Sequence, residues 1–360
     1  MAHHITNFTS QAPLHPVARE ALLGAFDQGW ADPDKLSYQS STARILRDES
    51  VAIIARHLKV APHQLEFIGD PALGNFHAIA GLLKPSTLLI HSAIDRSEVM
   101  AIAHDRKSIQ LTVASNGEIN CDSLEPAPPH DSLFALQVAN GETGVIQQCN
   151  RIIEIFPTSK IACDFSSAGL RVPLPDRWDS AFFDAKSWQG PEGVGIIAIA
   201  ADDQWRNPLP HIGPQRTTSS VSLPLLMATA VAMDSWVGDE ATESQRLRAL
   251  SSFLRSEIRA GIPDCDIAGD LDNSLPHINS FSFLYVNGEE LLRHLDRAGF
   301  AVDSGSACSA QNLTPSHVLA AMGLLTHGNV RITLHHGTQH EDVVSLVAAL
   351  KSAVSEIRST

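Results

Sequence analysis

Four short apolar runs decide the fold: LFALQV at 133–138, KIACD at 160–164, SAFF at 180–183 and VGIIAIA at 194–200. Each run is bounded by polar or turn-forming residues, which is typical of buried strands. The runs are too short for helices that cross a domain. They predict a sheet that is covered on both faces.

The same alternation continues outward from this stretch. Further strand-like runs lie at 65–68, 87–91 and 108–113. Helical patterns separate several of the strands, at 40–58, 73–83 and 97–103. Strands interleaved with helices favour parallel pairing through right-handed crossovers. The sequence therefore predicts an α/β fold with a mainly parallel sheet and helices on both faces.

The order of elements changes towards the C-terminus. Residues 223–260 have helical composition with only Gly238 as an internal breaker, so this segment is expected to bridge two units. We expect a large domain over residues 15–250. Residues 1–14 and 251–360 are expected to form a smaller α/β domain of ordinary size.

Charge and cysteine content exclude several classes of protein. The chain has 360 residues, with 26 basic and 40 acidic side chains and a net charge of −14. This surplus opposes binding to nucleic acid or to anionic membranes, which need clustered Lys and Arg. The five cysteines form no C-x-x-C pair, and no histidine spacing indicates a metal site. We expect reduced thiols, no metal, no membrane span and a cytoplasmic location.

Ligands of open α/β sheets sit beyond the carboxyl ends of the strands. Asp164 ends one such strand, where its carboxylate either faces a ligand or caps the following turn. Lys186 lies just before the tight turn at 190–193. A lysine there forms a Schiff base if it is desolvated, although most lysines are simply solvated.

Two C-terminal residues stand out as candidates for chemistry. Cys308 lies in DSGSACSA (303–310), a run of small residues that suits a loop presenting a nucleophilic thiol. The alternative is a small buried cysteine. Arg331 lies within the apolar VRITL run at 330–334, where its guanidinium either clamps a carboxylate or reaches water from an edge strand.

Taken together, these motifs resemble the cysteine desulfurases of the class-V aminotransferase, fold-type-I pyridoxal-phosphate (PLP) superfamily. The likeness extends from about Ile5 to the C-terminus. The motifs that show this likeness are DSGSAC (303–308), LTPSHVL (313–319), MGL (322–324), VRITL (330–334), LPHIN (275–279), NGETGV (140–145) and GPEGVG (190–195).

The resemblance implies a function and roles for particular residues. Members take sulfur from L-cysteine as a persulfide, leave alanine, and pass the sulfur to an acceptor protein, for example in iron–sulfur cluster assembly. Cys308 would carry the persulfide, Arg331 would clamp the substrate carboxylate, and Asp164 would pair with the pyridine nitrogen of PLP. The resemblance also implies a homodimer. Further cofactor contacts would fall at Asn140, Ser167, Ser187 and Ala72.

The cofactor positions also carry departures from the family pattern. The spacing from Asp179 to Pro191 places Ser187 where the PLP-binding lysine belongs and Lys186 where a histidine precedes it. In an extended segment these neighbours would point to opposite faces, so Lys186 would need a local shift of register to reach the cofactor.

Other departures gather at the same pocket. The ring-stacking histidine falls at or near Arg96, an asparagine at Gly141 and a glutamine at Ser167. The phosphate-binding segments read DPAL at 70–73 and SVSL at 220–223. Asp70 adds negative charge there, and Pro71 removes an N–H donor.

Two hypotheses follow from this pattern. In the first, the chain is a PLP-dependent cysteine desulfurase in which Lys186 replaces the missing lysine. In the second, it is a family member without PLP chemistry that acts as a dimer partner, a scaffold or a persulfide relay through Cys308. A third, weaker possibility keeps PLP but changes the reaction.

Overall fold

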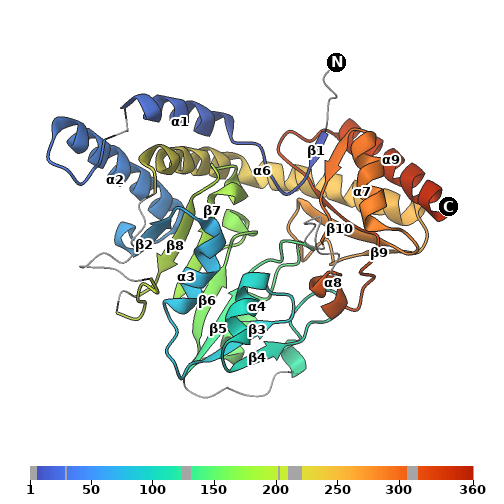
Figure 1. The fold of residues 1–360 in the computed structure, drawn as a ribbon, viewed down its shortest axis with the longest axis horizontal. Coiled ribbons are helices and arrows are strands. Elements are labelled where there is room, and N and C mark those ends of the chain that lie inside the picture. Colours follow the sequence, from blue (N-terminus) through green and yellow to red (C-terminus); the bar gives the residue numbers. More distant parts are fainter. Residues whose placement is uncertain are drawn as a thin grey trace.

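The structure is a computed structural model that describes residues 6–28, 31–123, 131–201, 203–209, 221–305 and 315–359. Figure 1 shows two units joined by one long helix. Among the described residues, no helix is long and apolar enough to cross a membrane.

The larger unit is built on a seven-stranded sheet. Five adjacent strands, β7, β6, β5, β3 and β4, run parallel, whereas β8 is antiparallel to both β7 and β2. The strands in spatial order are β2 (Leu65–Ile68), β8 (Gly195–Ile199), β7 (Ser180–Asp184), β6 (Lys160–Asp164), β5 (Ser132–Gln137), β3 (Leu88–Ser92) and β4 (Ser108–Leu111). The predicted α/β fold with a mainly parallel sheet is confirmed.

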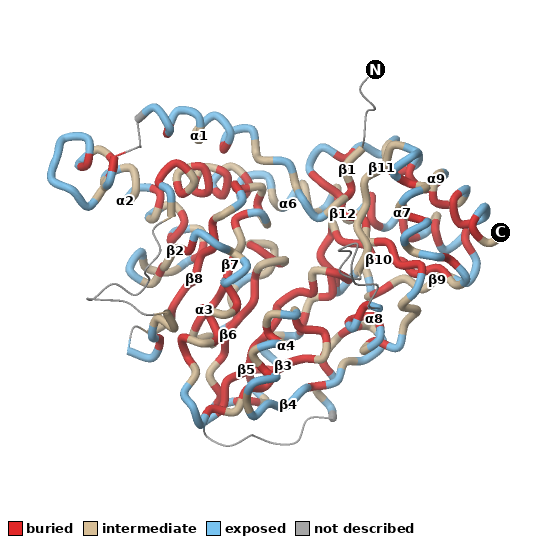
Figure 2. Tube along the Cα trace, in the orientation of Figure 1, coloured by how far each residue is buried: buried red, intermediate tan, exposed pale blue. Residues whose placement is uncertain are grey.

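Helices cover both faces of this sheet. On one face, Ile79 of α3 and Val99 of α4 pack with Leu89 and Phe182 of the strands. On the other face, the core includes Met233 and side chains from α2 and α5. The helices of this unit are α1 (Pro16–Gln28), α2 (Tyr38–Leu58), α3 (Gly74–Ala80), α4 (Ser97–His104) and α5 (Cys149–Ile155). Figure 2 shows the central strands buried between these layers, whereas β4 at the edge of the sheet is mostly exposed.

The second unit has its own core and its own sheets. Strand β1, next to the N-terminus, pairs in parallel with β11, and Phe8 joins a core made otherwise of C-terminal residues. The elements are β1 (Thr6–Phe8), β9 (Cys265–Ile267), β10 (Ile278–Phe283), α7 (Gly288–Arg297), β11 (Phe300–Val302), α8 (His317–Ala321), β12 (Asn329–Thr333) and α9 (His340–Ser359). The predicted division into residues 15–250 on one side and residues 1–14 and 251–360 on the other stays a prediction.

Helix α6 (Leu223–Gly261) connects the two units, and it confirms the helix predicted over 223–260. Its first half buries Leu226, Met233 and Trp236 in the core of the large unit. Its second half buries Leu250 and Leu254 in the second core. The two units are therefore joined by one continuous helix.

Candidate active site

The carboxyl ends of β6 and β7 bring two carboxylates to the same edge of the sheet. Asp164 ends β6, and its side chain is only 7% exposed. Its Oδ2 lies 3.3 Å from Nε of Arg96 and accepts a hydrogen bond of 3.1 Å from the amide of Asn75. Its Oδ1 accepts a bond of 2.8 Å from the backbone N–H of Ser166. Both oxygens of this buried carboxylate therefore have partners within the chain.

Arg96 connects three of the positions at which the chain departs from the family pattern. Its Nη2 donates a hydrogen bond of 3.2 Å to Oγ of Ser167. A Cβ added at Gly141 would lie 2.6 Å from that same Oγ and 3.4 Å from Nη2 of Arg96. Arg96, Ser167 and Gly141 thus form one contact group beside Asp164.

Lys186 and Ser187 lie on a single turn of 3₁₀-helix, Ala185–Trp188. The extended conformation expected here is wrong, because the carboxylate of Asp184 accepts the N–H of Lys186 and starts the turn. Side chains on such a turn point about 120° apart. Lys186 and Ser187 therefore project in different directions, although not to opposite faces.

The amine of Lys186 is held by carboxylates near the surface. Its Nζ lies 3.9 Å from Oδ2 of Asp184 and 3.6 Å from Oε1 of Glu192, and the side chain is 42% exposed. The hydroxyl of Ser187 donates a bond of 2.8 Å to the backbone carbonyl of Asp184. The backbone carbonyl of Ser187 accepts a hydrogen bond of 3.0 Å from the guanidinium of Arg171.

Sequence reasoning missed Asp184, although it ends the SAFF run as Asp164 ends KIACD. Burial raises the pKa of Asp184, while the N–H and charge of Lys186 and the charge of Arg96 lower it, with a net rise. The signal was present in the sequence, since both carboxylates follow an apolar run directly. This edge of the sheet carries more negative charge than was expected.

Two further predicted cofactor contacts are already engaged within the chain. The amide of Asn140 donates to the carbonyl of Ile94 at 3.0 Å and to Gln137 at 2.9 Å, and its oxygen accepts the N–H groups of residues 142 and 143. The N–H of Ala72 is donated to the carboxylate of Asp70 at 3.0 Å. The amide of Asn140 thus joins its own turn to the carbonyl of Ile94, and the N–H of Ala72 closes a local turn with Asp70.

Arg331 lies on β12 and reaches towards the same region. Its Nη2 contacts Oδ2 of Asp303 at 2.7 Å, and its Nη1 donates to the carbonyl of Gly141 at 3.2 Å. Burial would raise the pKa of Asp303, but the hydrogen bonds and charge of Arg331 and the N–H of Ser10 lower it overall. The guanidinium is thus fixed in orientation, and its side chain is 20% exposed.

The segment that carries Cys308 begins at this ion pair. Gly305, at the end of the described stretch, donates its N–H to Oδ1 of Asn329 at 2.6 Å. Cys308 itself lies outside the described residues, as does Ser220. The other four cysteines are free, namely Cys121, Cys149, Cys163 and Cys265. Burial raises the pKa of each of these thiols.

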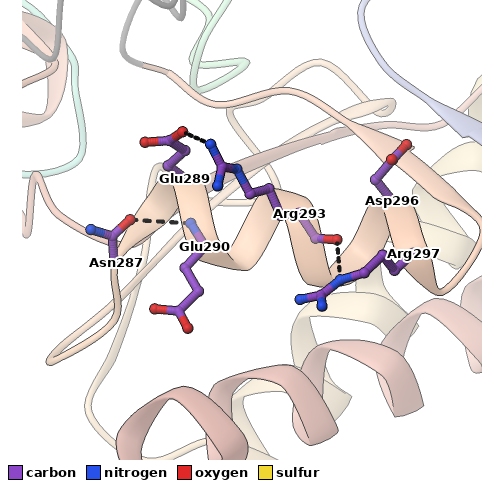
Figure 3. Close-up of a pocket in the computed structure, with 6 residues that line it drawn as sticks. All are labelled: Asn287, Glu289, Glu290, Arg293, Asp296 and Arg297. Carbon is purple, nitrogen blue, oxygen red and sulfur yellow. Dashed lines mark hydrogen bonds and ion pairs between the residues drawn. The ribbon is translucent and has the colours of Figure 1, made fainter. Parts of the chain in front are cut away.

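A separate hollow lies in the second unit. It measures about 590 Å³ and lies along α7, lined by Asn287, Glu289, Glu290, Arg293, Asp296 and Arg297. Figure 3 shows that its polar groups bond to one another along the same helix, as Arg293 does to Glu289. It is not near Asp164, and we do not assign chemistry to it. No group of side chains in the described ranges is arranged to hold a metal ion.

Comparisons with known proteins agree with the resemblance seen in the sequence. The model of the class-V aminotransferase family matches residues 90–346. A cysteine desulfurase IscS from Vibrio atlanticus is 30% identical over 98% of this chain and 93% of its own length. Another from Dictyoglomus turgidum is 27% identical over 98% of this chain and 95% of its own.

Solved structures share the fold across almost the whole chain. A NifS-like protein superposes with a TM-score of 0.86 at 21% identity, covering 98% of this chain and all of its own. The NifS-like protein from Rickettsia africae gives a TM-score of 0.84 at 18% identity, with 98% and 100% covered. At these identities the superpositions establish the fold.

Proposed function

Because the chain belongs to the class-V aminotransferase family, we propose that it is a cysteine desulfurase-like protein in which Cys308 carries sulfur from L-cysteine as a persulfide. The relatives that match over nearly its full length are named cysteine desulfurases. The small-residue segment around Cys308 and the strand bearing Arg331 are both retained.

The ion pair between Asp303 and Arg331 carries this proposal. A guanidinium held by a carboxylate on one side and by the carbonyl of Gly141 on another keeps a fixed orientation, which suits recognition of a substrate carboxylate. Cys308 follows Asp303 by five positions. Such a tether spans at most about 18 Å, so the sulfur carrier stays within reach of the clamp.

The family implies PLP, which when bound supplies the electron sink for breaking the C–S bond of cysteine. The residues described at this edge of the sheet do not fit it. Arg96 engages Asp164, a hydroxyl stands at 187, and the amine of Lys186 lies between two carboxylates. The N–H of Ala72 is donated to Asp70. We therefore assign no step to PLP.

No other lysine lies at this edge of the sheet. The chain has seven lysines, and three of them, Lys84, Lys107 and Lys160, precede or begin the parallel strands at their opposite ends. Lys35 and Lys59 flank α2, and Lys351 pairs with Glu257 in the second unit. Among the lysines of this chain, Lys186 alone follows a strand near Asp164.

Two balanced reactions can place a sulfur atom on the thiol of Cys308. In the desulfurase reaction, the C–S bond of L-cysteine breaks, an S–S bond to Cys308 forms, and alanine leaves. In a relay, the Cys308 thiolate attacks the outer sulfur of a persulfide, the donor's S–S bond breaks, and the donor leaves as a thiolate without net oxidation.

The relay is the second candidate, and one observation favours it: the pairing of Arg96 with Asp164. The comparisons give it no support, since the matching relatives are named for the enzyme activity. In both candidates Cys308 is the sulfur carrier, and an acceptor protein receives the sulfur. A changed PLP reaction would leave Cys308 without a role.

We also propose a homodimer in the cytoplasm. Several large apolar side chains on and near α1 and α2 are exposed, and a second copy of the chain would cover them. They are Leu23, Phe26, Leu36, Tyr38 and Ile45. Figure 2 shows that most of α1 is exposed. The absence of a C-x-x-C pair from the sequence and the free state of the four described cysteines support a reducing compartment.

One experiment tests the function and separates its two forms. The purified chain receives PLP and L-cysteine, or inorganic polysulfide instead, and mass spectrometry then locates sulfur on Cys308 while alanine is quantified. Alanine together with a Cys308 persulfide indicates desulfuration. A Cys308 persulfide that forms from polysulfide but not from L-cysteine indicates a relay. If neither donor places sulfur on Cys308, the proposal is contradicted. Cys308→Ser should abolish the sulfur loading, and Cys265→Ser, at another free cysteine, is its matched control.

A further inference from the structure

The contacts of Arg96 show that three departures at the cofactor pocket fit one another. Arg96, Gly141 and Ser167 are far apart in the sequence, yet Arg96 donates to Ser167 and both lie against Gly141. At this pocket the guanidinium of Arg96 is paired with Asp164 through Nε and donates from Nη2 to the hydroxyl of Ser167, in the space left by Gly141.

Gly141 supplies the space that this contact needs. A Cβ at this position would approach Oγ of Ser167 to 2.6 Å, which is closer than real Cβ contacts allow. The hydroxyl of Ser167 would then have to turn away from Arg96. The glycine, the serine and the arginine are therefore compatible with one another as a set.

The electrostatics of this edge favour a resident cation. Asp164 is almost completely buried, and a buried carboxylate without a positive partner is costly. Asp184 lies close enough to interact with Asp164, Arg96 and Lys186. Two carboxylates near one guanidinium attract cations and repel the phosphate group of a cofactor.

We infer that Arg96 is a built-in counter-ion that takes the place of the PLP ring at Asp164, so that this chain does not hold PLP covalently on Lys186. The group that the resemblance pairs with Asp164 is a pyridine nitrogen. The guanidinium now makes that contact, and Ser167 and Gly141 hold it there. This inference leaves the relay through Cys308 unaffected, whereas the desulfuration of L-cysteine needs the electron sink that PLP supplies.

The first test uses the unmodified chain. One equivalent of PLP is added, borohydride fixes any Lys-linked cofactor, and peptide mapping locates it. We expect no adduct at Lys186 and no absorbance band from a Lys-linked cofactor. A stoichiometric adduct at Lys186 would overturn the inference, whatever Cys308 does.

The second test supplies the missing amine and then removes the counter-ion. Ser187→Lys alone leaves Arg96 on Asp164, whereas Ser187→Lys with Arg96→His frees the carboxylate. We expect the double variant to bind PLP at least about tenfold more tightly than the single one, by absorbance titration. Equal affinity of the two variants would show that Arg96 does not compete for Asp164.

A matched control separates this effect from a general loss of positive charge. Arg151 pairs with Asp122 and is half exposed on α5. Ser187→Lys with Arg151→His should therefore bind PLP as Ser187→Lys does, and tighter binding would contradict the inference. Circular dichroism checks that each variant is folded. If the Arg96 variant is not folded, the mapping of the unmodified chain decides.

Discussion

The guanidinium of Arg96 lies against the carboxylate of Asp164, with Nε 3.3 Å from Oδ2, although 68 positions separate the two residues. This pair joins the start of α4 to the end of β6. Asn75 adds a third group from α3. The pair thus ties together three elements of the large unit.

Removing the positive partner should destabilise the chain. Arg96→Ala leaves Asp164 buried without a cation, while Asn75 and the N–H of Ser166 still donate to it. We expect a loss of about 1–3 kcal/mol, less than for a fully buried pair because Arg96 is 38% exposed. Urea unfolding measures it. Arg151→Ala, at an exposed pair, should cost less than about 1 kcal/mol, and equal losses would contradict the prediction.

Gly141→Ala should disturb the contact between Arg96 and Ser167. The added Cβ meets Oγ of Ser167, so the hydroxyl must move, at an expected cost of about 1–3 kcal/mol. Ser167→Ala removes the obstructing atom. The double variant should therefore be more stable than Gly141→Ala alone, as a double-mutant cycle of urea unfolding will show. Simple additivity would mean that the two positions do not clash.

Asp95 should make the stability of the fold depend on pH. Burial raises its pKa to about 8, the N–H of Ser92 lowers it, and Asp164 raises it. The folded chain then holds one proton more than the unfolded chain between pH 3.8 and about 8. The stabilisation is therefore complete below pH 3.8 and is lost as pH rises, by about 1.4 kcal/mol per unit.

Asp95→Asn removes this titration and keeps the shape of the protonated acid. The free energy of unfolding, measured across pH 4 to 8, should then fall less steeply than for the unmodified chain. The exposed Asp105 at the end of α4 gives the control, and Asp105→Asn should leave the slope unchanged. An unchanged slope in Asp95→Asn would show that this carboxyl titrates normally.

Arg331→Lys tests the clamp. Lysine keeps the charge but cannot contact Asp303 and the carbonyl of Gly141 together in the same fork geometry. In the desulfurase form of the proposal, sulfur loading of Cys308 should need about tenfold more L-cysteine. Loading from polysulfide, which has no carboxylate, should not change. A similar loss with both donors would mean that Arg331 does not recognise the carboxylate.

Cys308 should be the thiol that reacts first. Burial raises the pKa of Cys149 and of Cys265 to about 12, and raises those of Cys121 and Cys163 as well. Thiolates, not thiols, react with alkylating agents, so these four react slowly at neutral pH. Peptide mapping after brief alkylation should find the label on Cys308. Earlier labelling of a different cysteine would contradict its proposed role.

The sheet was largely predictable, because its strands are short apolar runs. Strands β2 and β6 occupy the predicted residues 65–68 and 160–164. The antiparallel direction of β8 was not predicted. Only ten residues join β7 to β8, and a parallel crossover needs a dozen or more, so the sequence contained that signal.

The site was predictable as a set of candidates but not as contacts. Comparison with the family pattern identifies Arg96, Gly141 and Ser167 as three separate departures. Their meeting depends on the neighbouring positions of β3, β5 and β6 in the sheet, which no local pattern specifies. The turn at Lys186 was also misjudged, since a side-chain cap from Asp184 overrides the extended conformation there.

Helix α6 contributes side chains to both hydrophobic cores over 39 residues, a length of about 58 Å. Neither core stays intact if its half of the helix unwinds. If one unit unfolds and α6 unwinds, the other unit loses the helix side chains that complete its core. We therefore expect heat or urea to unfold the whole chain in a single cooperative transition.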